Sequence, residues 1–198
     1  MRFHPYQIFP QLERKPGPGV EKMPFYEDIA AKRRPDETAS DRAIKRSALE
    51  DCWRKENLHL APGGRVGNSF DAQRLIWFGR LCGKENEMVE SVMLAHHTDG
   101  KCLTDPGVLL DIAECAGFAR DEATTFLNSQ RGCADVASKT LSYFNSGITA
   151  TPVIVFDNRF PFYGAPDVAD LKNGVEQLLE TGEIDPPVPS RNNSANFP

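Results

Sequence analysis

The spacing of apolar residues divides the chain into a long helical middle and two ends with strand character. From about 25 to 146, apolar positions recur at helical spacing, whereas 2–9 alternates and predicts a short strand. Val153–Phe156, a continuous apolar run, predicts a strand covered on both faces, and 159–163 predicts its antiparallel partner. A last helix is expected from about Asp167.

Capping residues mark where several helices begin. Thr38, with Asp41 three residues later, resembles a capping box that opens a helix through Glu56. Asn68–Ser69 and Asp105–Pro106 open two further helices. The apolar helix positions that should face the core are Ile44, Ala48, Cys52, Ala72, Leu75, Ile76, Gly79, Leu109, Ile112, Ala113, Ala116, Val168, Leu171, Val175, Leu178 and Leu179.

Composition describes a soluble globular protein of one domain. The 198 residues are 40% hydrophobic and carry a net charge of −5, which argues against nucleic acid or an anionic membrane as partner. No run has the apolar length of a signal peptide or a membrane span, so we expect a cytoplasmic protein. The residues beyond about 181, rich in proline, asparagine and serine, are expected to be disordered.

The cysteines do not form a redox or metal motif. The chain has five, at positions Cys52, Cys82, Cys102, Cys115 and Cys133, and no two form Cys-x-x-Cys. This spacing indicates scattered, reduced thiols. We interpret Cys52, Cys82 and Cys115 as small buried residues. If one thiol is reactive, we expect Cys133, because the pattern places it at a helix start.

The histidine pair His96–His97 suggests a metal cluster with Asp99 and Cys102, but its spacing is unsuitable. Adjacent side chains on a helix point about 100° apart. No His-Glu-x-x-His or Cys-x-x-Cys spacing supports the pair. The sequence therefore predicts no metal site, and nothing in it indicates a cofactor.

The most specific local feature is a proline that opens the apolar strand. Pro152 lies directly before Val153, and proline is the residue before which cis peptide bonds occur. The stretch Gly147–Phe156 is typical of the cis-proline strand of thioredoxin-like folds. The plainer alternative is a trans proline that only starts a strand.

Four motifs in this order resemble the DsbA-like branch of the thioredoxin superfamily, and within it the FrnE-like oxidoreductases. The likeness runs from about residue 2 to 180. The matching stretches are 2–10, 68–75, 97–100 with 105–117, and 147–156 with 163–165. The resemblance implies an α/β thioredoxin-like fold, incomplete at its N-terminus, with a large all-helical insertion.

The resemblance also implies how one domain, 1–180, is organised. Its thioredoxin parts would be about 1–12 and 147–180, its helical insertion about 25–146, and 181–198 its disordered tail. Family members begin with a strand and a helix that carry Cys-x-x-Cys, and neither has a counterpart here. The missing strand would lie centrally, between 2–9 and 153–156. We therefore interpret the chain as a truncated or mis-started member, or a fragment.

The function implied is that of a thiol–disulfide oxidoreductase-like protein that is catalytically incomplete. No catalytic residue is assigned, and whether the chain is an enzyme stays open. By family analogy, Thr151, Pro152 and Asn68 would bind a substrate such as a thiol-containing peptide or glutathione. The alternatives are loop geometry alone for Thr151 and Pro152, and helix capping for Asn68 and Ser69.

Two other functions remain open from the sequence. Kappa-class glutathione transferases and 2-hydroxychromene-2-carboxylate isomerases share the helical insertion and bind glutathione. Asp71–Arg74 and Gly164–Ala165 favour the oxidoreductases over them. A non-enzymatic thioredoxin-like module that binds peptides is the third hypothesis. The sequence does not indicate an oligomeric state.

Overall fold

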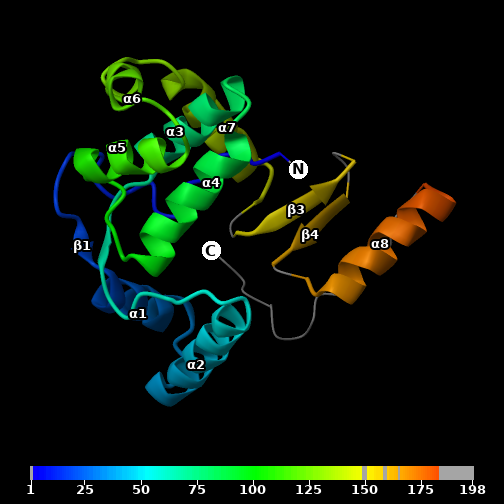
Figure 1. Cartoon of the computed structure of the whole chain (residues 1–198). Coiled ribbons are helices and arrows are strands. Elements are labelled where there is room, and N and C mark those ends of the chain that lie inside the picture. Colours follow the sequence, from blue (N-terminus) through cyan, green and yellow to red (C-terminus); the bar gives the residue numbers. More distant parts are fainter. Residues whose placement is uncertain (1, 149–150, 158–159, 165, 183–198) are drawn as a thin grey trace. The chain divides into compact units, whose positions relative to one another are not determined.

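The computed structural model describes residues 2–148, 151–157, 160–164 and 166–182. It divides into two compact units, 1–140 and 141–198 (Figure 1). Several sequence predictions fall outside the described residues, namely those for Asn158 in the hairpin turn, for Ala165, and for the tail from 183 onward.

The first unit is built of helices, as the apolar spacing predicts. Two short strands, which the sequence analysis missed, pair antiparallel beside them. The elements that lie in or begin in this unit are β1 (Val20–Glu21), α1 (Lys22–Arg33), α2 (Ala39–Lys55), β2 (Arg65–Val66), α3 (Phe70–Leu81), α4 (Glu85–Met93), the π-helix η1 (Leu94–Thr98), α5 (Pro106–Cys115), α6 (Arg120–Leu127) and α7 (Cys133–Asn145).

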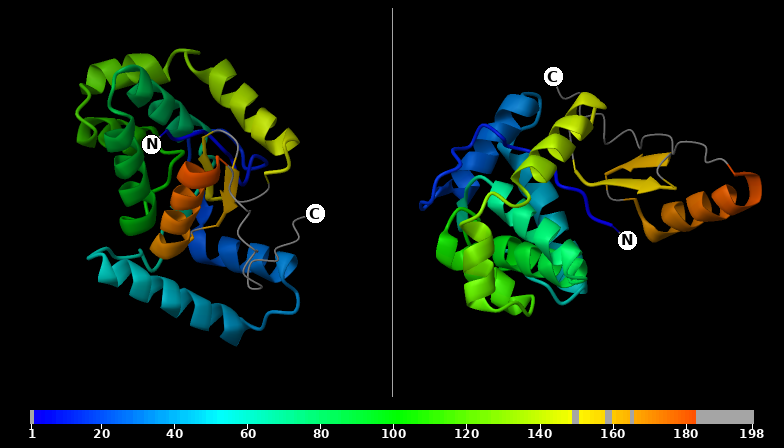
Figure 2. Two further views of the ribbon diagram at one scale, coloured as in Figure 1. Left: turned by 90° about the vertical axis from the view of Figure 1, so that its right-hand side faces the viewer. Right: turned by 90° about the horizontal axis from the view of Figure 1, so that it is seen from above.

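The core of this unit lies between α3, α4, α5 and α6 (Figure 2). Leu75 of α3, Met88 of α4 and Ala113 of α5 are fully buried. The rings of Phe78 and Phe126 stack with their centroids 4.4 Å apart, which packs α6 against α3. The positions predicted to be apolar on α3 and α5 are all buried, so the predicted faces of these helices are confirmed.

Helix α2 forms where the capping box predicts, but its apolar side faces outward. Thr38 accepts a hydrogen bond from the Asp41 amide, and the Asp41 carboxylate accepts one from the Thr38 amide. Ile44 is nevertheless 66% exposed, and no residue of α2 is fully buried. The prediction that the Ile44 face joins the core is therefore wrong.

The N-terminal segment is extended but forms no strand, so that prediction is also wrong. A strand needs a ladder of backbone partners, and no described segment supplies one. Side chains hold the backbone instead. Phe3 N donates a hydrogen bond to the Glu85 carboxylate over 3.1 Å. The side chains of Gln73 and Thr140 donate to the carbonyls of Tyr6 and Pro5, over 3.4 and 3.5 Å.

The second unit is a hairpin followed by a helix, as predicted. Its elements are β3 (Val153–Phe156), β4 (Phe160–Tyr163) and α8 (Val168–Thr181). The strands are antiparallel, with Ile154 opposite Phe162. Asp167 caps α8, because its side chain accepts a hydrogen bond from the amide of Asp170 over 2.8 Å.

Gly174 lets α8 lie close to the hairpin. Phe162 is the most buried side chain of the hairpin, and a Cβ atom added at Gly174 would lie 2.7 Å from its Cζ. The ring therefore occupies the space above the glycine. This contact shows which face of the hairpin α8 covers. Because side chains alternate along a strand, the face that carries Phe162 also carries Ile154, Phe156 and Phe160.

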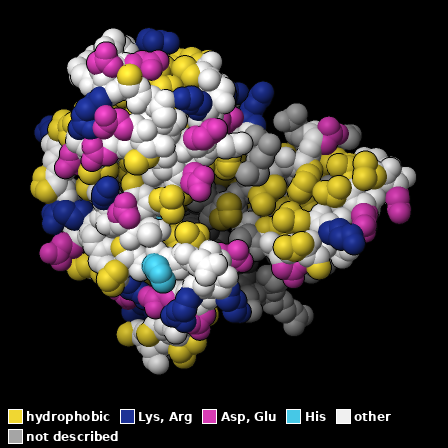
Figure 3. Space-filling model, in the orientation of Figure 1, with side chains coloured by type: hydrophobic (Ala, Val, Ile, Leu, Met, Phe, Trp, Pro, Cys, Tyr) yellow, Lys and Arg dark blue, Asp and Glu magenta, His cyan; other side chains and the backbone are white. Residues whose placement is uncertain are grey.

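Much of the apolar surface of the second unit is uncovered. Val155 of β3 is 47% exposed, so the prediction of a strand covered on both faces is wrong. Tyr163, Val168 and Leu179 are 61, 82 and 80% exposed. None of the apolar residues predicted for α8 is fully buried. Figure 3 shows hydrophobic side chains gathered over the hairpin and α8.

Candidate functional site

Thr151 and Pro152 lie together at the beginning of β3, and both are exposed. The peptide bond between them is cis. Gly164 N donates to Pro152 O over 2.9 Å, so the hairpin ladder continues one step beyond the strand. Asn68 belongs to the first unit, whereas Thr151 and Pro152 belong to the second.

The outer edge of β3 beside this dipeptide has backbone groups that β4 does not use. Pro152 and Gly164 form a hydrogen-bonded pair, so Ile154 and Phe162 form the next one. By the same alternation, the N–H and C=O groups of Val153 and Val155 point away from β4. No described strand pairs with them. The edge can therefore accept an extended chain.

The opposite edge of the hairpin differs. Pro161 lies opposite Val155, at a position of β4 whose backbone points outward. Proline has no N–H to donate there, and it is found in sheets mainly on edge strands for that reason. The two edges of this hairpin are thus chemically unequal, and only the β3 edge has a continuous set of donors and acceptors.

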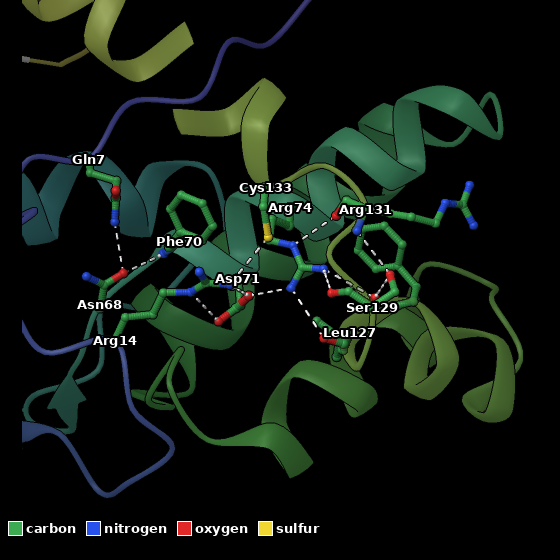
Figure 4. A network of polar contacts seen from close by, with 11 residues as sticks. Gln7, Arg14, Asn68, Phe70, Asp71, Arg74, Leu127, Ser129, Arg131 and Cys133 are labelled. Atoms are coloured by element: carbon green, nitrogen blue, oxygen red, sulfur yellow. Dashed lines mark hydrogen bonds and ion pairs between the residues drawn. The ribbon is translucent and has the colours of Figure 1, made fainter. Parts of the chain in front are cut away.

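Asn68 is almost completely buried, and both polar atoms of its side-chain amide form hydrogen bonds within the first unit (Figure 4). Its Oδ1 accepts hydrogen bonds from Gln7 Nε2 and from Phe70 N, each over 2.9 Å. Its Nδ2 donates to Leu12 O over 2.7 Å. Asn68 therefore accepts a hydrogen bond from the first amide of α3, from the position just before the N-cap residue Ser69. Ser69 makes no side-chain cap hydrogen bond, so that part of the capping prediction is wrong.

A buried arginine that the sequence analysis missed lies one turn further along α3. Arg74 is 1% exposed and its guanidinium donates to four backbone carbonyls, two at the end of α6 and two in the α6–α7 connection. These carbonyls belong to Phe126, Leu127, Ser129 and Arg131. Figure 4 shows the guanidinium at the centre of this network. Charged residues in helices are usually solvated, so the sequence gives little indication that Arg74 is buried.

Asp71 joins Arg74 to a second arginine. Its Oδ1 accepts hydrogen bonds from Arg74 over 2.7 Å and from Arg14 over 2.9 Å. Burial alone would raise the pKa of Asp71, but the two guanidinium groups outweigh burial and lower it. Arg14, Asp71 and Leu109 also line a cavity of about 160 Å³. Arg74 is buried in this network, whereas Arg14 and Asp71 keep 43% and 29% of their side chains exposed. The guanidinium of Arg74 is paired and hydrogen-bonded, and this is typical of a structural role.

Cys133 lies at the edge of the same network. It is the first residue of α7, as the sequence predicts, and its Sγ lies 3.7 Å from Arg14 Nη2. It is half-buried, whereas Cys52, Cys82 and Cys115 are exposed and Cys102 is buried. The interpretation of those three exposed cysteines as buried residues is wrong, because each lies on the outward side or at the end of its helix.

The two histidines of η1 lie beside a buried lysine. Lys22 Nζ donates to His96 O over 2.8 Å, and the ring of His97 lies 5.6 Å from that of Trp53. Burial and the Lys22 charge lower the pKa of His96 to about 4 and also lower that of His97. In the part of the chain that the structure describes, no group of three or more His, Cys, Asp or Glu side chains could hold a metal ion.

Comparison with known proteins places these features in a family. The family model of the DSBA-like thioredoxin domain matches residues 1–176. The chain belongs to this family. Its fold is the DsbA-like thioredoxin fold with a helical insertion, as the sequence resemblance predicts.

A solved structure agrees with this assignment. The chain is similar to a probable DsbA oxidoreductase from Streptomyces coelicolor, with a TM-score of 0.72 and 17% sequence identity. The match covers 91% of this chain and 75% of that one. At this identity the similarity shows the fold alone. No curated protein matches the chain. None of the helices described here is long and apolar enough to cross a membrane.

Proposed function

We propose that this chain is a DsbA-family thiol–disulfide oxidoreductase-like protein that binds thiol-containing peptides without exchanging disulfides by itself. The observation that carries the proposal is a family membership without the family's chemistry. The family match spans 1–176, yet these 198 residues contain no Cys-x-x-Cys and all five cysteines are free.

The catalytic half of the proposal rests on the absence of a Cys-x-x-Cys pair from these 198 residues. Disulfide exchange proceeds by attack of a thiolate and passes through a mixed disulfide, which a second nearby thiol resolves. Single cysteines such as Cys133 can form the mixed disulfide but have no neighbouring thiol in sequence to release it. We therefore expect no turnover from this chain.

The surface around Thr151 and Pro152 supports the binding half. Both residues are exposed, and they adjoin the edge of β3 at which Val153 and Val155 have outward N–H and C=O groups. An extended peptide adds to such an edge through its main chain, and neighbouring side chains select the peptide. A peptide carrying a thiol is the substrate class that the family assignment favours.

Two measurements test the two halves separately. Insulin reduction with dithiothreitol should proceed at the background rate when this chain is added, and turnover above background would contradict the catalytic half. Calorimetry should detect a cysteine-containing peptide, with Thr151→Arg abolishing the binding. Val168→Arg is the matched control, because it adds the same charge at an exposed residue of the same unit.

Binding of glutathione distinguishes this proposal from the alternative that the chain is a transferase-like glutathione-binding protein. The expected result is that glutathione does not displace the peptide. If glutathione binds and the peptide does not, the transferase-like alternative replaces this proposal. If neither binds, or if Thr151→Arg has no effect, the surface at Thr151 is not a binding site.

A further inference from the structure

Helix α2 is only lightly attached to the rest of the first unit. None of its residues is fully buried, and it lies at the margin of that unit (Figures 1 and 2). Arg42 donates a hydrogen bond to Glu27 of α1 over 2.9 Å. Nearer the C-terminal end of α2, the ring of Trp53 lies 5.6 Å from that of His97 in η1. A helix held in this way can separate at a free-energy cost well below that of unfolding the whole unit.

Two histidine rings lie where α2 meets η1. His96 and His97 contact each other edge to face, with their ring centroids 4.9 Å apart, and Trp53 lies against the second of them. The backbone carbonyl of His97 also accepts a hydrogen bond from Ala61 N over 2.7 Å, so the connection that follows α2 is held by η1 as well. Release of α2 and of this connection would therefore open the histidine pair to water.

The charges that act on this pair are cationic. Lys22 of α1 is 7% exposed, and its Nζ donates to His96 O over 2.8 Å. Burial, and then the nearby Arg46 of α2, lower the pKa of Lys22. The other group at the contact, the indole of Trp53, has no charge. The histidines therefore lie beside a buried ammonium group and an aromatic ring.

The acidic groups nearest in sequence are engaged elsewhere. Asp99, directly after η1, pairs with Lys101 over 3.5 Å, and Glu50 of α2 pairs with Arg46 over 3.1 Å. Among the residues that the structure describes, no carboxylate forms an ion pair with Lys22 or with either histidine. A proton added to either ring would thus place a second positive charge beside a buried one, without compensation.

We propose that the contact between η1 and α2 is acid-sensitive, and that protonation of His96 and His97 releases α2 while the core of the first unit stays folded. Neutral rings fit beside Lys22 and Trp53, whereas charged rings require water or a counter-ion. Burial and the Lys22 charge lower the pKa of both histidines, that of His96 to about 4. Released histidines take up protons at their ordinary pKa of about 6.5, so release becomes progressively more favourable as pH falls below that value.

Trp53 itself reports the release. The chain has two tryptophans, and Trp77→Phe leaves Trp53 as the only one. Its emission maximum should shift to longer wavelength between pH 7 and pH 4.5, because the indole ring exchanges His97 for water. Replacing both η1 histidines by glutamine, which stays neutral, should remove this pH dependence. His59→Gln is the matched control, because His59 is exposed, and it should leave the shift unchanged.

Lys22→Met tests the electrostatic cause. The substitution keeps the apolar part of the side chain and removes its charge. Protonation of the docked histidines then costs less, so the emission shift should be smaller or should require a lower pH. A shift of the same size and midpoint in this variant would overturn the proposal.

Hydrogen exchange distinguishes local release from unfolding of the whole unit. A released 17-residue helix is only marginally stable alone, so its amides should exchange readily. After correction for the intrinsic pH dependence, exchange in α2 relative to α3 should be about tenfold faster at pH 5 than at pH 7. Equal acceleration in α2 and α3, an emission maximum that does not move, or a shift that persists in the histidine double variant would each overturn the proposal.

Discussion

The side chain of Gln7 donates a hydrogen bond to Asn68 Oδ1 over 2.9 Å, and this bond joins the N-terminal segment to the beginning of α3. The same Oδ1 accepts from Phe70 N, while Nδ2 donates to Leu12 O. One buried amide therefore holds both the segment and the helix end.

Replacing Asn68 should be far more damaging than replacing its neighbour. We expect Asn68→Ala to lower the free energy of unfolding by about 2 kcal/mol, because buried polar partners lose their hydrogen bonds. Ser69→Ala should change it by less than about 0.5 kcal/mol, since Ser69 makes no cap hydrogen bond. Urea denaturation measures both. Equal effects would mean that Asn68 does not have the structural role assigned to it.

Arg74→Met should destabilise the first unit strongly. The substitution keeps the apolar part of the side chain but removes the Arg74 donor from carbonyls such as those of Ser129 and Arg131. We expect a loss of about 3 kcal/mol in the free energy of unfolding. The control is Arg120→Met, which removes an exposed arginine paired with Asp111 and should lower the free energy of unfolding far less than Arg74→Met does.

Gly174→Ala should destabilise the second unit although alanine favours helices. The added Cβ would lie 2.7 Å from Phe162 Cζ, so the ring must move. We expect a loss of about 1–3 kcal/mol, the usual range for overpacking. Adding Phe162→Leu to Gly174→Ala should recover part of that loss, because the shorter side chain leaves room. Asn173→Ala, on the exposed side of α8, should be neutral or stabilising. Thermal unfolding followed by circular dichroism reports all three.

The folded protein should lose stability as pH falls from about 6.5 to about 4, in part through His96. Burial and Lys22 lower the pKa of His96 to about 4 in the folded state, below the ordinary value of 6.5. The unfolded chain therefore binds this proton at higher pH than the folded chain does, so protonation favours unfolding.

The size of this effect can be isolated by substitution. It amounts to at most about 3 kcal/mol, and it is constant below about pH 4. His96→Asn should show a shallower loss of stability over the same pH range in urea denaturation. Identical pH profiles for the two proteins would contradict the assigned cause.

Iodoacetamide labelling of the native protein should separate the cysteines by exposure and surroundings. We expect Cys102 to label last, because it is buried. Reactive cysteines lie in electropositive, partly exposed surroundings, and Cys133 beside Arg14 meets both conditions. Peptide mass spectrometry over time gives the order. Cys133 labelling no faster than the exposed Cys52 would contradict the prediction that it is the most reactive thiol.

Local signals in the sequence predicted the helices and the hairpin well. The Thr38 capping box, the Asp105–Pro106 helix start and the apolar face of α3 all appear where expected, because each depends on neighbouring residues only. Failures occurred where a segment depends on distant partners. Residues 2–9 pair with no described strand, and the face of α2 that carries Ile44 does not join the core.

The candidate site was predictable to a similar degree. Thr151 and Pro152 lie at a strand start as expected, because an apolar run after proline is a local signal. The burial of Arg74 was not predictable, since the backbone carbonyls that accept its hydrogen bonds lie more than 50 residues away in the sequence. Charged side chains are ordinarily solvated, so sequence alone favours the wrong environment for such a residue.

Pro161 has a consequence for every larger sheet in which this hairpin takes part. A neighbouring strand beside β4 would meet a position without a donor, whereas one beside β3 would meet Val153 and Val155 with their backbone groups free to pair. An additional strand is therefore expected beside β3, and β4 is expected to stay at the edge of the sheet. The sheet would then grow from the side on which Thr151 and Pro152 lie.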